Sequence, residues 1–260
     1  METLLQLILP SVILPLFLSI LLWRFSLINS TASGILPLIW LPSYFWLNGW
    51  LPLIPAEVVH WLWWLLTGSM VINLMFKSRL VLLAVFQTAL LSIILITVAW
   101  PVLQYKIDLM LIIEMLAVIF TAYTVLGRTV KNNAPIPVLS LTICFAGMGL
   151  VVTLGGSLLI AQLAGAMASI LVVFACWEVM SKQQASINAL RLVPVVQLYL
   201  LTLVIARIFV EIPLTTFILL LIALLASLIP TIRYAYILTV TSVVTAICQL
   251  LLDADVNSYY

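Results

Sequence analysis

The sequence predicts an all-helical, polytopic membrane protein: a bundle of about ten transmembrane helices with both chain ends on the outer side. Two features of the composition predict this class. Apolar residues make up 66% of the 260 residues, charged residues make up only 7%, and the mean hydropathy is +1.34. A soluble domain carries about 25% charged residues. With so few charges, this chain could not cover its own surface in water, so lipid must solvate most of it.

Ten apolar segments emerge when the chain is divided at charged residues, Pro and Gly. A spanning helix needs about 20 apolar residues, within a range of about 17–25. The predicted segments are approximately 3–23, 34–52, 56–76, 80–102, 109–127, 138–155, 157–179, 194–211, 213–230 and 234–252. The second contains Pro37, Pro42 and Pro52 and is the weakest. A re-entrant or interfacial course is the alternative for that segment.

The basic residues of the loops predict the orientation of these segments. Ten spans place consecutive loops on alternating sides, and Lys and Arg are enriched on the inner side. One set of loops holds Arg24, Lys77, Arg79, Arg128, Lys131, Lys182, Arg191 and Arg233. The opposite set holds only Lys106. This bias predicts that both termini lie on the outer side.

Tryptophans supply an independent check on the orientation. Six of them fall near the predicted outer ends of the segments: Trp46, Trp50, Trp61, Trp63, Trp64 and Trp100. Indole rings collect at membrane interfaces because they have an apolar body and one N–H group. We interpret these residues as interfacial anchors, with a tryptophan-lined quinone or sterol groove as the alternative.

Several classes of function are excluded by what the chain lacks. A net charge of +2 is too small for a nucleic-acid interface. The three cysteines lie far apart inside apolar segments, and His60 is the only histidine, so the sequence predicts no metal site and no cofactor. No aspartate falls within a predicted span, and no serine lies near a suitable histidine. We therefore expect that the protein is not an enzyme.

Two charged residues fall well inside the predicted spans, at similar depth below the outer face. A third, Glu178, lies one turn before Lys182 at the inner interface and is interpreted as an interfacial pair with that lysine. Glu114 lies about five residues into its segment, roughly 8 Å deep at 1.5 Å per residue, and Arg207 lies near the outer end of segment 194–211. Glu211 follows Arg207 by four residues, as in a helical ion pair. Charges at membrane depth are candidates for function. In the functional interpretation Glu114 exchanges protons or Arg207 binds an anion. In the structural interpretation Arg207 is neutralised by Glu211 or Glu114.

Uncharged polar side chains form a second group of candidates. Gln87 and Gln162 are amides within spans, as are Asn73 and Gln197. Such amides usually bond a neighbouring helix, which contributes about 0.6–2 kcal/mol. A role for Gln87 or Gln162 in binding a substrate or ion is the alternative.

A row of small residues marks segment 157–179 and its start. Gly156, Ala161, Gly165 and Ala168 recur at spacings close to one helical turn. Such faces allow two helices to approach closely, so these residues are predicted to pack against another helix. Gly147 and Gly149 extend the pattern into segment 138–155. We expect these two segments to be central in the bundle or to contact another subunit.

Taken together, these patterns predict a single integral membrane domain over residues 1–260. It divides into two five-helix halves, 1–128 and 129–260, of inverted orientation, as in many transporters. We expect a multi-pass protein of the bacterial inner membrane, acting as a transport- or ion-translocation-associated subunit with partner chains. The alternative is a non-catalytic scaffold or anchor subunit. The expected partners are membrane lipid and other membrane subunits, with no nucleic acid.

Overall fold

The computed structural model describes residues 8–24, 36–50, 55–76, 79–105, 109–132, 137–181, 189–227, 229 and 232–257, and within these ranges the chain forms helices joined by short connections, without strands. A short π-helix, η1 (Leu9–Ile13), precedes the α-helices. These are α2 (Leu14–Arg24), α3 (Leu36–Asn48), α4 (His60–Phe76), α5 (Leu80–Leu103), α6 (Leu109–Asn132), α7 (Val138–Leu154), α8 (Leu158–Ser181), α9 (Ala189–Phe209), α10 (Leu214–Ala226) and α11 (Ile232–Asn257).

Each of the ten predicted segments corresponds to one α-helix, which confirms the all-helical class. Five of the helices are long and apolar enough to cross a membrane: α5, α6, α8, α9 and α11. Large apolar side chains also cover the outside of the bundle, with Leu74, Val81 and Phe120 at least two-thirds exposed. A surface of this kind is stable in lipid rather than in water. Lys77, Lys106 and Lys182, which contribute to the predicted orientation, lie outside the described residues.

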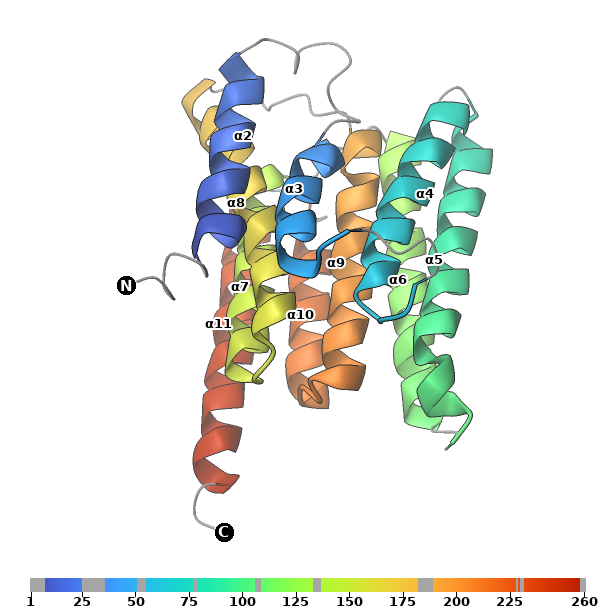
Figure 1. The fold of residues 1–260 in the computed structure, drawn as a ribbon, viewed down its shortest axis with the longest axis vertical. Helices are drawn as coiled ribbons and strands as arrows, with labels where there is room; N and C mark the ends of the chain where they lie inside the picture. The colour runs from blue at the N-terminus through green and yellow to red at the C-terminus, as the bar shows by residue number, and fades with distance from the viewer. Residues whose placement is uncertain are drawn as a thin grey trace.

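Helix α3 is short, as the prolines in its segment suggested. Its 13 residues extend about 20 Å, less than the roughly 30 Å of a hydrocarbon core. The lower ends of α3 and α4 also lie above the lower ends of α5 and α9 (Figure 1). Trp40 fixes α3 to the bundle, because its buried indole N–H donates to the carbonyl of Leu163 in α8 at 3.0 Å. Trp46 and Trp50, near the end of α3, are exposed.

Helix α9 is the most buried of the long helices. It lies between α4, α5 and α6 on one side and α7 and α8 on the other, and it also contacts α10 (Figure 1). Over the most apolar window of each helix, 83% of α9 is buried, compared with 67% of α8. The helix at the centre of the bundle is thus α9, and α8 packs beside it against η1, α2, α3 and α7.

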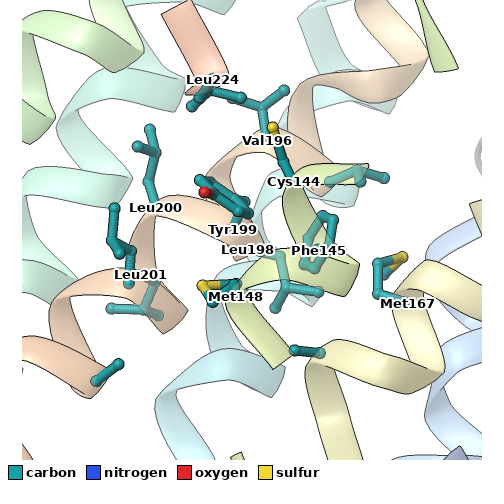
Figure 2. Close-up of a cluster of buried hydrophobic side chains, with 14 of the residues drawn as sticks. Cys144, Phe145, Met148, Met167, Val196, Leu198, Tyr199, Leu200, Leu201 and Leu224 are labelled. Carbon is teal, nitrogen blue, oxygen red and sulfur yellow. The ribbon is translucent and has the colours of Figure 1, made fainter. Parts of the chain in front are cut away.

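One tyrosine of α9, Tyr199, contacts both α7 and α10 in the core of the bundle. Tyr199 is fully buried among side chains of α7, α9 and α10 (Figure 2). Its ring meets that of Phe145 edge to face, with centroids 5.2 Å apart, and its hydroxyl donates to the carbonyl of Leu220 in α10 at 3.0 Å. Because the polar end of the ring has an acceptor, Tyr199 can fill the core without leaving an unpaired group.

The small residues divide between packing and turn formation. Ala161 and Ala168 are buried as predicted, and a β-carbon on the half-buried Gly165 would meet Ser11 of η1 at 3.9 Å. Gly156 is different, because it is exposed and has φ +95° in the turn between α7 and α8. There the N–H of Ser157 bonds the carbonyl of Val152, as in a Schellman ending. Within this chain Gly156 therefore forms the turn, and the predicted packing against another helix would have to involve a second subunit.

The contact between η1 and α8 includes a hydrogen bond close to a proline. Pro15 has no N–H group with which to bond the carbonyl of Ser11 in an α-helix. That carbonyl accepts a hydrogen bond from Ser169 Oγ of α8 at 3.1 Å. A polar bond between two helices thus accompanies the close packing at Gly165.

We predict that Gly147→Ala destabilises the protein by about 1–3 kcal/mol, the usual cost of overpacking. A β-carbon at Gly147 would overlap Val243 of α11, whereas one at Gly127 of α6 would meet no atom within 4 Å. Gly127→Ala is the matched control and should be neutral or stabilising by up to about 1 kcal/mol. Thermal unfolding in lipid nanodiscs measures both. Equal stability of the two variants would contradict the close approach of α7 and α11.

Candidate functional site

An ion pair between α6 and α9 is the central feature of the site. Glu114 lies in the second turn of α6 and Arg207 in the last turn of α9. Arg207 Nε donates to Glu114 Oε2 at 3.0 Å and to Oε1 at 3.2 Å, and Nη2 donates to Oε1 at 3.1 Å. The Glu114 side chain is 5% exposed and that of Arg207 26% exposed. Such a two-pronged contact fixes both the depth and the rotation of the two helices.

Arg207 also binds the connection between α9 and α10. Its Nη1 donates to the carbonyl of Ile212 at 2.7 Å, and Ile212 is itself buried. Pro213 caps the start of α10 immediately afterwards. One guanidinium therefore joins α6, α9 and the start of α10.

The expected helical pair between Arg207 and Glu211 does not form. Helix α9 ends at Phe209, and Glu211 adopts φ +57°, in the left-handed region. The chain has therefore left the helix before the four-residue spacing can bring the two side chains together. Glu211 is exposed and forms no ion pair among the described residues. Of the two partners considered for Arg207, the structure selects Glu114.

Beside the ion pair, a groove runs along the bundle between α6 and α10. Its volume is about 300 Å³, and its lining is apolar except for Glu114 and Thr121. The lining residues recur at helical spacing on each helix: Met110, Ile113, Glu114, Ala117, Phe120 and Thr121 from α6, and Leu214, Phe217, Ile218, Leu221, Ile222 and Leu225 from α10. Because Ile113, Phe120, Ile218 and Ile222 are exposed at the bundle surface, the groove opens sideways.

A second polar group joins α4, α5 and α9 around Gln87. The Gln87 amide N–H groups donate to the carbonyl of Ser69 and to Asn73 Oδ1, each at 2.8 Å. Its amide oxygen accepts from Ser69 Oγ at 2.8 Å. Gln197 Nε2 of α9 donates to the backbone carbonyl of Gln87 at 2.9 Å. Gln87 thus bonds neighbouring helices, as expected of an amide in a membrane helix.

One acceptor in this second group has no partner among the described residues. Gln197 is 1% exposed, and its Oε1 atom accepts no hydrogen bond from the part of the chain that the structure describes. The opposite amide orientation would set that oxygen against the Gln87 carbonyl, so the orientation is fixed by the contact.

Gln162 lies on α8, a helix that contributes to neither polar group.

Sequence reasoning identified Glu114, Arg207 and Gln87 but missed the groove and Ser69. The groove residues are ordinary apolar residues, and the sequence does not indicate which apolar faces border a gap between helices rather than a neighbouring side chain. Ser69 is a common packing residue in membrane helices. Within the described ranges, no group of three or more His, Cys, Asp or Glu residues could hold a metal ion.

Comparison of the chain with protein-family models, with curated proteins and with solved structures found no match. Function must therefore be inferred from the geometry of the chain itself.

We predict that Glu114→Gln and Arg207→Gln each destabilise the protein by about 3 kcal/mol, because each leaves one charge unpaired. The double variant should recover part of this loss. Unfolding in nanodiscs, analysed as a double-mutant cycle, gives the coupling. Glu57 and Arg79 are exposed and supply the control cycle, which should be additive. Additivity for Glu114 and Arg207 as well would contradict the ion pair.

Proposed function

We propose that this chain is a multi-pass protein of the bacterial inner membrane with ten membrane segments and both ends on the outer side. The distribution of basic residues supports this orientation, since eight fall in one set of loops and one in the other. The helices support the segment count, because every predicted segment contains one. In this arrangement the Glu114–Arg207 pair lies near the outer face.

We infer that the protein is a transport- or ion-translocation-associated subunit that works with partner chains and is not itself an enzyme. The observation that carries this proposal is the buried ion pair in an otherwise apolar bundle. Charged side chains are costly in hydrocarbon and usually mark ion or substrate pathways. Glu114 additionally lines the groove between α6 and α10, so the pair has a side that is not closed by other helices.

In this proposal Glu114 is the group that takes up and releases a proton. Protonation removes the negative charge that balances Arg207, and an unbalanced arginine in a span costs about 2.5–3.5 kcal/mol on insertion scales. Proton uptake must then be accompanied by an anion at Arg207 or by movement of α9. Proton uptake at Glu114 is thus coupled either to anion binding at Arg207 or to movement of α9, and this coupling needs no cofactor.

Helix α9 takes part in both polar groups, through Gln197 and through Arg207, and the stretch of helix between these two residues offers no open route for an ion. Gln197 and Arg207 are ten residues apart, about 15 Å along the helix. Every residue between them is buried, and Thr202, the hydroxyl nearest the middle, bonds its own helix at the carbonyl of Leu198. An ion that passes between the groups therefore requires α9 to move relative to α4, α5 and α6.

The alternative function is a non-catalytic scaffold or anchor subunit of a larger membrane complex. The observation that favours it is the number of elements that Arg207 joins, namely α6, α9 and the connection to α10. If the ion pair serves only to hold α6, α9 and the connection to α10 together, Glu114 need not exchange protons. Partner subunits are expected under both proposals.

The proposed orientation predicts the behaviour of reporters fused after Tyr260. Alkaline phosphatase, which is active only outside the cytoplasm, should be active, and a fluorescent reporter that matures only in the cytoplasm should be dark. Fusions in the connection at residues 133–136 should behave in the opposite way and serve as the control. An inactive phosphatase with a bright fluorescent reporter after Tyr260 would contradict ten segments.

The proposed transport role predicts proton flux in liposomes that contain the protein purified together with its native partners. A pH-sensitive dye inside the vesicles should report flux when a membrane potential is imposed, and Glu114→Gln should abolish it. Glu211→Gln is the matched control, because it also removes one carboxylate near the outer face, and it should retain flux. Equal flux for both variants would exclude Glu114 as the carrier. The absence of both proton and chloride flux would favour the scaffold.

A further inference from the structure

We propose that the groove between α6 and α10 binds a single phospholipid, with one hydrocarbon chain in the groove and the phosphate on Arg207. The proposal does not depend on ion translocation, because a bound lipid can be detected without any flux. It rests on the shape of the groove, on the unused donors of Arg207 and on Glu114, which contacts Arg207 and also lines the groove.

The groove is suited to one hydrocarbon chain. It has about 300 Å³ of space and an almost wholly apolar lining, with Ala117 and Leu221 among the residues on its two sides. Helices α6 and α10 contact each other at few points, so the groove separates them over much of their length. The exposure of Ile113 and Ile218 opens it to the surrounding lipid.

Arg207 has donors left for an anionic headgroup. A guanidinium has five N–H bonds. Within the described part of the chain, Glu114 takes the Nε–H and one N–H of Nη2, and Ile212 takes one N–H of Nη1. Among the described residues, one N–H on each terminal nitrogen has no acceptor, and the Arg207 side chain is five times as exposed as that of Glu114, 26% against 5%. Charged N–H donors of this kind suit the free oxygens of a phosphate.

Glu114 connects the two halves of the proposed site. Its carboxylate holds Arg207, and the same residue lines the groove. Leu214, at the same end of the groove, follows Ile212 by two residues. One molecule can therefore place its headgroup at Arg207 and its chain along α6 and α10. Glu114 lies about 8 Å from the start of α6, close to the depth at which headgroup and chain meet.

The chemistry of these contacts selects the ligand. Arginine offers only donors, so the headgroup must supply acceptor oxygens, and the groove requires a long apolar chain. A membrane phospholipid meets both requirements and is abundant at this depth. The phosphate shares the guanidinium with Glu114, so the positive charge lies between two negative ones.

Native mass spectrometry of the delipidated protein tests the site. Phosphatidylglycerol added back should bind with one molecule per chain, and diacylglycerol with the same chains, which lacks the phosphate, should not be retained. Ala117→Phe fills the groove and should lose the bound lipid. Ala89→Phe, at an exposed alanine of α5, is the matched control and should keep it. Arg207→Lys retains the charge opposite Glu114 but removes the Nη1 and Nη2 donors of the guanidinium, so this variant should also lose the lipid.

Three results would overturn the proposal. The first is equal retention of phosphatidylglycerol by Ala117→Phe and Ala89→Phe. The second is equal retention of diacylglycerol and phosphatidylglycerol by the unaltered protein. The third is a co-purified ligand whose mass is that of a quinone or another compound without phosphate. If Ala117→Phe does not fold, Arg207→Lys replaces it, and retention of the lipid by that variant would equally contradict the site.

Discussion

The bundle depends on three polar side chains of α9, each of which bonds a different neighbouring element. Gln197 bonds α5, Tyr199 bonds α10, and Arg207 bonds α6 and the connection that follows α9. In hydrocarbon an unpaired polar group is costly, so these bonds cannot be exchanged for bonds to solvent. They fix the depth and rotation of α9, and the surrounding helices are positioned by the partners that they supply. Apolar packing, which is available on every side of α9, could not select one arrangement in this way.

The helices could be predicted from the sequence because charges and prolines interrupt the apolar segments. Pro137 and Pro213 stand immediately before α7 and α10, and Gly155 and Gly156 end α7. The boundaries of α9 were less accurate: the helix begins at Ala189, five residues before Pro194, and ends before Glu211. Pro194 therefore lies inside the helix, where it removes one backbone hydrogen bond without ending it. The prediction of a helical pair at Arg207 and Glu211 failed because the helix ends before Glu211.

The site could be predicted only where it carries charge or amide groups. Glu114 and Arg207 are conspicuous among apolar residues, and their similar depth suggested that they could meet. No sequence feature indicates that α9 lies at the centre of the bundle, because buried and lipid-facing positions are both apolar in a membrane protein. The groove along α6 and α10 is hidden for the same reason. Gly147, which α11 contacts most closely, resembles any other glycine in the sequence.

The long separation of these partners along the chain has a consequence for biogenesis. Arg207 follows Glu114 by 93 residues, and Gln197 follows Gln87 by 110. At about 5–20 residues per second, ribosomal synthesis leaves roughly 5–20 seconds between the synthesis of Glu114 and that of Arg207. During that interval Glu114 has no arginine within the membrane. The early helices must therefore remain at the insertion machinery until α9, the most buried of the long helices, is inserted and supplies their partners.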